Sequence, residues 1–299
     1  MARKEKRPKI RLQGHEKFPL REGWINKGIN LVLEYPDIFR GKEGPDRFGV
    51  GNNMVKAIRY WLKAFALINE RPGQGAELTE LGATISECDP YLEEVFTLWI
   101  LHSNLVKNVG EATTWFMFFN RCDLEEFNKE ELFKRIYREV FKYAGHDNFS
   151  AQSLKNDIDL LLNMYGKEKG FSDPEEKNVS PLVRLGLIKK GDSLPGKKGE
   201  MVYLKNHPDK KSISEWVVLY ELSGMLEEID SIGIDKVSTG EKSIGAIYQL
   251  SRVSINEYLD KLDALGFIKV DRTAGLDVIY RIEDLNKGQI LRNYYEQHR

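Results

Sequence analysis

The sequence predicts a mostly α-helical protein with small β wings, built from several winged-helix (helix-turn-helix) units around a helical core. Apolar residues recur at helical spacing over long segments, which is the pattern of amphipathic helices. Three times, such a helix is followed by a short apolar strand, a turn-rich segment and a second segment of strand character. That order of elements is typical of a winged helix, in which the turn-rich segment forms the wing.

The composition is that of a globular protein without a membrane-spanning segment. The chain has 299 residues, of which 41% are hydrophobic and 30% are charged, enough for two or three domains. No apolar run approaches the ~20 residues that cross a membrane, and the basic start of the chain lacks the apolar stretch of a secretory signal. Cys88 and Cys122 indicate neither a disulfide framework nor a zinc site. We therefore expect a cytoplasmic protein with no metal and no cofactor.

Charge is distributed unevenly along the chain. The net charge is −1, but residues 1–63 hold 15 lysines and arginines against 7 acids, whereas residues 212–299 hold 10 against 15. A basic excess at one end attracts phosphate, although a solvated tail without a partner is the alternative. We divide the chain into a basic arm (1–17), a winged-helix-like domain (18–86), a helical core that could include a second such unit (87–211), and a C-terminal winged-helix domain (212–299).

The clearest helical pattern lies in the first unit, directly after residues 49–53. Glycines in this segment tolerate a tight turn, and the asparagines that follow are good helix N-caps. The next helix has an apolar stripe on one face, and its opposite face carries cations, amides and a phenol but no acid. Such groups contact phosphates and base edges in the major groove of DNA. Strands near 66–69 and 78–79 would flank a wing at 71–75. The candidate contact residues are Asn52, Asn53, Lys56, Arg59, Tyr60 and Lys63.

A dense aromatic cluster marks the middle of the chain. Residues 115–119 read Trp-Phe-Met-Phe-Phe, and we interpret them as core packing rather than as a nucleobase-stacking or cofactor site. Amphipathic helices are predicted over 129–143 and 152–165, with Ser150 as the N-cap of the latter. A loop over 191–199 resembles a second wing.

The C-terminal unit has the same order of elements but a different surface. We predict Ser214 and Ser254 as helix N-caps, Gly266 as a helix end, and strands over 267–271 and 277–282 around a wing at 272–275. The exposed face of its third helix leans acidic, which is unfavourable against phosphate. We therefore interpret this unit as a structural or protein-contact module. The exposed residues are Arg252, Asn256, Glu257, Asp260, Lys261 and Asp263.

No motif of enzyme chemistry is present in the sequence. There is no Walker loop, no GxGxxG and no GxSxG, and no pair of histidines has metal-ligand spacing. Asp157 and Asp159 lie two residues apart in a predicted helix, on different faces, and so cannot act as a carboxylate pair. An enzyme would need a site assembled between domains, for example around His15, His102 and Trp115.

Several phrases of the sequence resemble a prokaryotic family known as domain-of-unknown-function family 4007. They are HEKFPLREGWINKG, GVGNNMVKAIRYWLKAF, LTELGATISECDPYLEEVFTLWILHSNLVKN, ATTWFMFFN and FSAQSLKNDIDLLLNMY. The resemblance covers roughly residues 15–205. It implies a companion of sulfurtransferase-type enzymes that resemble phosphoadenosine-phosphosulfate reductases, encoded in gene islands for phage defence and DNA sulfur modification. It supplies no catalytic residues.

Two functional hypotheses follow. The first is a DNA-binding accessory or regulatory protein that contacts double-stranded DNA through the first recognition helix and the basic arm. The second is an interaction scaffold for a partner enzyme, since winged helices also bind proteins. The sequence leaves a homodimer open. The arm residues expected to contact DNA are Arg3, Lys4, Lys6, Arg7, Lys9 and Arg11.

Overall fold

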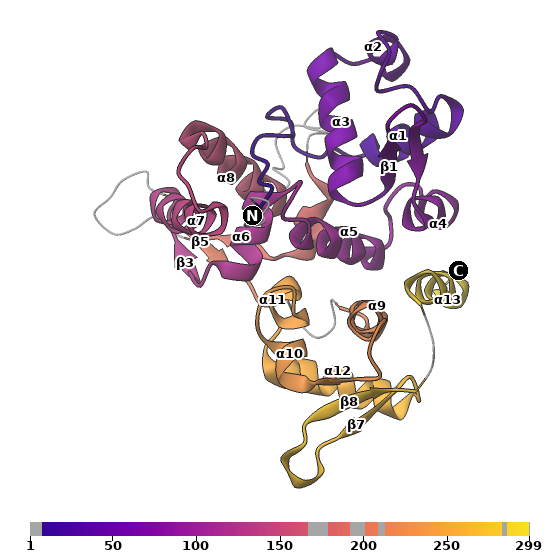
Figure 1. The fold of residues 1–299 in the computed structure, drawn as a ribbon, viewed down its shortest axis with the longest axis vertical. Helices are drawn as coiled ribbons and strands as arrows, with labels where there is room; N and C mark the ends of the chain where they lie inside the picture. Colours follow the sequence, from indigo (N-terminus) through magenta and orange to yellow (C-terminus); the bar gives the residue numbers. More distant parts are fainter. Residues whose placement is uncertain (1–7, 167–178, 192–200, 209–212, 283–285, 299) are drawn as a thin grey trace, which may run out of the picture.

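The computed structural model describes residues 8–166, 179–191, 201–208, 213–282 and 286–298 (Figure 1). Within these residues the protein is mostly helical, with three small antiparallel sheets. The buried apolar side chains form one connected cluster that extends from Leu20 to Tyr295. None of the described helices combines the length and the apolar character required to cross a membrane.

The N-terminal region places three helices before a β-hairpin. Helix α1 (Trp24–Glu34) packs against α3 (Asn52–Ala64), and the short α2 (Gly44–Phe48) lies between them in sequence. Strands β1 (Ile68–Arg71) and β2 (Gly75–Leu78) pair antiparallel and lead into α4 (Glu80–Cys88). The N-cap of α3 is Gly51 rather than an asparagine, and no side chain caps this end. The helix therefore starts at Asn52, earlier than an asparagine cap predicts, and both asparagines lie in its first turn.

The middle region contains the aromatic core. Helices α5 (Val95–Lys107) and α6 (Thr113–Arg121) precede β3 (Glu126–Phe127), α7 (Lys129–Ala144) and α8 (Ala151–Gly166). A short 3-10 helix, η1 (Pro181–Leu185), leads to β4 (Ile188–Lys190) and β5 (Tyr203–Lys205), and the sheet order is β3-β5-β4. The aromatic side chains of α6 are buried, which confirms the prediction of a packing role. The predicted wing at 191–199 falls almost entirely outside the described residues.

Two side-chain caps define helix ends in this region. Asn128 and Glu131 form a reciprocal capping box at the start of α7, with each side chain accepting from the other's backbone N–H. Ser150 Oγ accepts a hydrogen bond from the N–H of Ser153, as expected for the predicted cap of α8. Helices α7 and α8 thus each begin directly after a polar residue that caps them, Asn128 and Ser150.

The C-terminal region repeats the sheet order of the middle region. Its elements are α9 (Glu215–Met225), β6 (Ser231–Gly233), α10 (Ile234–Ser238), α11 (Ile244–Tyr248), α12 (Arg252–Ala264), β7 (Ile268–Asp271), η2 (Thr273–Gly275) and β8 (Val278–Arg281). The sheet order is β6-β8-β7, so the last strand is again central. The prediction of Ser254 as the cap of α12 is wrong: Ser251 Oγ accepts from the N–H of Ser254, and the helix starts at Arg252. Ser214 caps α9 as predicted.

A final helix, α13 (Lys287–His298), returns to the N-terminal half of the molecule and packs against α4 and α9 (Figure 1). The hydroxyl of Tyr295 lies 2.6 Å from Oγ1 of Thr97, and the ring of Tyr294 stacks on Phe96 with the ring centroids 3.7 Å apart. These contacts join the C-terminal helix to α5 of the middle region.

Candidate nucleic-acid interface

The exposed face of α3 is free of carboxylates. Asn52, Asn53, Lys56 and Arg59 are exposed, Lys63 is half-buried, and the helix contains no aspartate or glutamate. The positive end of the helix dipole and the backbone N–H groups of the first turn lie at the end that Asn52 and Asn53 occupy. An anion meets donors and positive charge at this end of the helix.

Lys56 is the cation on this face that is best placed to contact a partner. Its Nζ lies 3.3 Å from Oδ1 of Asn53, a neutral amide. Within the part of the chain that the structure describes, no carboxylate forms an ion pair with Lys56. A phosphate could therefore bind the ammonium group without first displacing an internal counter-ion.

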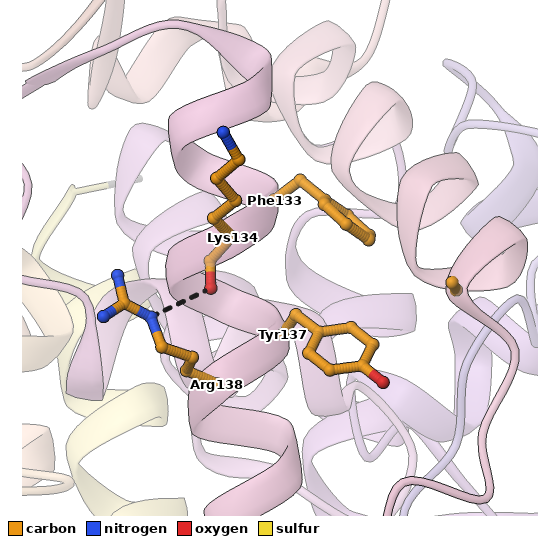
Figure 2. A pocket seen from close by; sticks show the side chains of 5 residues that line it. Phe133, Lys134, Tyr137 and Arg138 are labelled. Carbon is orange, nitrogen blue, oxygen red and sulfur yellow. Dashed lines mark hydrogen bonds between the residues drawn. The ribbon is translucent and has the colours of Figure 1, made fainter.

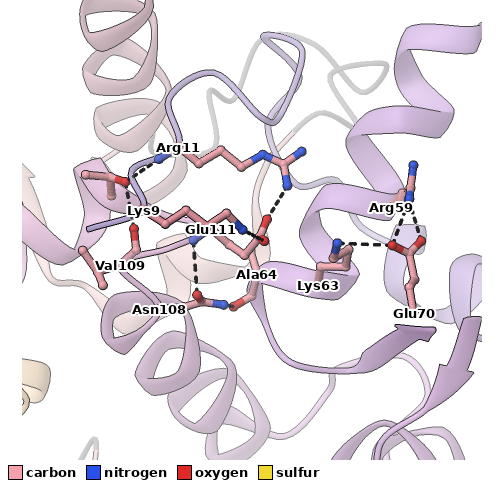
Figure 3. A network of polar contacts seen from close by, with 10 residues as sticks. Lys9, Arg11, Arg59, Lys63, Ala64, Glu70, Asn108, Val109 and Glu111 are labelled. Carbon is pink, nitrogen blue, oxygen red and sulfur yellow. Dashed lines mark hydrogen bonds and ion pairs between the residues drawn. The ribbon is translucent and has the colours of Figure 1, made fainter. Parts of the chain in front are cut away.

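The other two cations of α3 share an internal counter-ion, Glu70 on strand β1 (Figure 3). Arg59 Nε and Nη2 donate to the two carboxylate oxygens of Glu70 at 2.5 and 2.9 Å, and Lys63 Nζ lies 3.2 Å from the same group. Burial alone would raise the pKa of Glu70, but hydrogen bonds and charge from Arg59 and Lys63 outweigh it and lower the pKa below its usual value. The carboxylate therefore stays ionised and offsets positive charge on the C-terminal half of the α3 face.

Tyr60 does not lie on this face. The expectation that it is exposed is wrong, because only 2% of its surface is accessible. The segment that precedes α1 crosses over it: a Cβ on Gly14 would lie 2.5 Å from the ring, and the Arg11 guanidinium sits 5.1 Å from the ring centroid. Burial strongly raises the pKa of the phenol. Tyr60 is a core residue of the contact between the arm and α3.

The described part of the basic arm is bound to the protein itself (Figure 3). Lys9 Nζ lies 2.7 Å from Glu111, Arg11 forms an ion pair with the same carboxylate, and the N–H of Arg11 donates to Oγ1 of Thr113 at 2.8 Å. These two cations are thus partly neutralised before any partner arrives. The remaining predicted arm contacts, Arg3, Lys4, Lys6 and Arg7, lie outside the described residues.

The proposed inter-domain enzyme site is only partly assembled. His15 and Trp115 pack edge to face, with ring centroids 5.8 Å apart, whereas His102 contacts other residues. Both nitrogens of His15 are hydrogen-bonded: Nδ1 accepts from the N–H of Lys17 at 3.0 Å, so Nε2 donates to Asp157 at 2.8 Å. Both histidines are fully buried, which indicates a packing role.

The third helix of the C-terminal region presents a largely self-satisfied face. Arg272, from the segment between β7 and β8, donates to Asp260 at 2.6 Å and to Asn256 at 3.0 Å. Lys261 pairs with Glu215 at 2.9 Å. The cations near α12 are therefore engaged by carboxylates and an amide, which agrees with the unfavourable surface expected for phosphate.

Comparison with known proteins places the chain in a family. The model of the family described as "Protein of unknown function (DUF4007)" matches residues 12–295.

Two crystal structures of a protein named SspB share the fold at 22% identity. The magnesium ion-bound form has a TM-score of 0.82 over 96% of this chain and 87% of SspB, and the other has 0.81 over 95% and 88%. No curated protein matches significantly. The described residues contain no group of three or more His, Cys, Asp or Glu side chains that could hold a metal ion. The chain belongs to the DUF4007 family.

Proposed function

We propose that this protein binds double-stranded DNA through the N-terminal half of α3, as an accessory or regulatory component of a DNA-modification or phage-defence system. The observation that carries the proposal is the exposed, acid-free face of α3, with Lys56 and two asparagines beside an uncapped helix N-terminus. The defence context rests on the family resemblance alone.

The order of elements supports this assignment. Helices α1, α2 and α3 followed by the β1–β2 hairpin correspond to a winged helix, with α3 as the recognition helix and the turn at 72–74 as the wing tip. In that geometry Asn52 and Asn53 approach base edges, where an amide can pair with adenine, and Lys56 contacts a phosphate. The middle and C-terminal sheets, with orders β3-β5-β4 and β6-β8-β7, fit the same interpretation for the other two units.

Lys56→Ala is expected to weaken duplex binding roughly tenfold or more at low salt, because a hydrogen bond between charged groups contributes about 1.5–3 kcal/mol. The slope of log K against log salt should fall in magnitude by about 0.9, the value for one phosphate contact. Fluorescence anisotropy with a labelled duplex at three salt concentrations measures both. Lys236→Ala, an exposed lysine of the acidic C-terminal region, is the matched control. Equal affinities of the two variants would contradict the proposal.

Glu70→Gln is expected to strengthen duplex binding and to steepen the salt dependence. The substitution removes the internal counter-ion of Arg59 and Lys63, so both cations become available to phosphate. The slope should increase in magnitude by about 0.9 for each cation that gains a phosphate. Glu77→Gln on the same hairpin, where Glu77 pairs with Arg71, is the control. An affinity no higher than that of this control would show that DNA does not reach the C-terminal half of α3.

A protein scaffold is the second candidate, and one observation favours it. Six large apolar side chains in the described C-terminal region are exposed, namely Ile229, Val253, Leu265, Leu276, Tyr280 and Ile282. Exposed apolar side chains in the same region as an acidic helix face suit a partner protein better than DNA. If the purified chain fails to bind duplex at low salt, the scaffold becomes the preferred function. Pull-down of a sulfurtransferase-type enzyme, the partner implied by the family resemblance, then tests it.

A further inference from the structure

Helix α7 carries a regular alternation of aromatic and basic residues on its surface. An aromatic residue is followed directly by a cation three times, at intervals of four residues. Four residues advance an α-helix by about 6 Å, and residues at this spacing lie on one side of it. The helix therefore presents an aromatic stripe beside a cationic stripe. The pairs are Phe133–Lys134, Tyr137–Arg138 and Phe141–Lys142.

Two rings of the aromatic stripe, Phe133 and Tyr137, border an open hollow between α7 and the start of α8, and Phe141 lies one helical turn beyond it. The hollow has a volume of about 500 Å³ and is lined by Phe133, Lys134, Tyr137, Arg138 and Ala151. Figure 2 shows the rings of Phe133 and Tyr137 on the same side of α7. Both rings are half-buried, and 45% of Phe141 is exposed. Part of each ring surface is thus accessible from solvent over about two helical turns.

Two cations beside the hollow have no acidic partner in the described parts of the chain. Arg138 Nε donates to the backbone carbonyl of Lys134 at 3.3 Å, and Lys155 Nζ lies 5.1 Å from the ring centroid of Phe133. The Lys134 ammonium pairs with Glu130 at 2.6 Å, and both side chains are solvent-exposed. Exposed pairs of this kind contribute little, so such a lysine can exchange its partner at small cost.

We propose that this hollow is a binding site for single-stranded nucleic acid. Bases stack on the accessible faces of Phe133, Tyr137 and Phe141, while Arg138 and Lys155 contact the backbone phosphates. Proteins that bind single strands without sequence preference combine these two elements, a row of aromatic rings and a cationic track. An acidic peptide would match the charge, but its side chains would use three successive aromatic rings less well than three bases do. The site is separate from the duplex surface proposed on α3.

The test uses the full chain and a fluorescein-labelled oligothymidylate of about 15 nucleotides, the upper range of such sites. Tyr137→Leu keeps an apolar side chain but removes the stacking ring, and should weaken binding about fivefold or more, since stacking contributes ~1–3 kcal/mol per base. Arg138→Ala/Lys155→Ala, at two exposed positions, should reduce the salt slope by about 0.7 for each lost phosphate contact. This second variant remains informative if Tyr137→Leu perturbs the fold.

The controls separate stacking from charge and this site from α3. Tyr91→Leu replaces an exposed tyrosine elsewhere and should leave binding unchanged. Lys56→Ala should weaken duplex binding but not oligothymidylate binding, and this result supports two separate sites. Three outcomes would each overturn the proposal: no oligothymidylate binding at low salt, equal affinities of Tyr137→Leu and Tyr91→Leu, or displacement of the oligothymidylate by poly-glutamate at equal charge. Displacement by poly-glutamate would assign the hollow to acidic peptides.

Discussion

Asp157→Ala is expected to lower the free energy of unfolding by about 3–5 kcal/mol, because it leaves three buried donors unsatisfied at about 1–3 kcal/mol each. Only 1% of the Asp157 side chain is exposed. Its carboxylate accepts hydrogen bonds from the N–H of Gln13 at 2.8 Å, from Nε2 of His15 at 2.8 Å and from Oγ1 of Thr114 at 2.6 Å. Alanine leaves these three donors without an acceptor inside the protein.

The control is Asp159→Ala, two residues further along the same helix. Asp159 is 57% exposed and pairs with Lys129 on the surface, so its removal should cost less than about 1 kcal/mol. Urea unfolding of both variants, followed by circular dichroism, measures the difference. Similar midpoints for the two variants would show that the Asp157 network does not stabilise the fold as its geometry indicates.

The loss of Asp157 should also release the arm from α3. Gln13 and His15 belong to the segment that covers Tyr60, and His15 stacks on Trp61 with ring centroids 6.0 Å apart. Limited proteolysis near residue 13 should therefore be faster in Asp157→Ala than in Asp159→Ala. The comparison links the stability of the core to the position of the basic arm beside the proposed DNA surface.

Local pattern was sufficient to predict the main helices. The spacing of apolar residues predicted α3, α7, α8 and α12, and the opposite orientation of Asp157 and Asp159 is confirmed by their burial. Helix α13 was missed, although Ile290, Leu291, Tyr294 and Tyr295 have helical spacing and are buried. The spacing of these four residues is itself the signal of an amphipathic helix.

The composition of the candidate site depended on contacts that local pattern does not contain. Tyr60 is buried because a segment more than forty residues earlier crosses it. Glu70 neutralises Arg59 and Lys63 because the β-hairpin folds back beside α3. A phenol and three cations on one helix predict a polar face, but tertiary contacts decide which of them remain available to a partner.

The unfolding free energy should fall by about 3 kcal/mol as the pH is lowered from 7 to 4 because of His102 alone. This side chain is fully buried between α5, α8 and α11. Nε2 must donate to the carbonyl of Ile247, at 2.8 Å, so Nδ1 accepts from the hydroxyl of Tyr165 at 2.7 Å. Protonation would place a charge in the core and remove that acceptor, and burial lowers the pKa of His102 from 6.5 to about 4.

The direction of the pH effect follows from proton binding. Between pH 6.5 and about 4 the unfolded chain binds a proton at His102 and the folded protein does not, so acid favours unfolding in this window and has no effect through His102 above it.

His102→Gln retains a donor and an acceptor but cannot titrate. The variant should therefore lose about 3 kcal/mol less than the natural chain between pH 7 and 4, measured by urea unfolding at each pH. Glu70, Glu111 and Glu221 also have lowered pKa values and destabilise both proteins in acid, so only the difference reports on His102. Parallel pH profiles would mean that His102 is protonated in the folded core, with Nδ1 donating to the hydroxyl of Tyr165 instead of accepting from it.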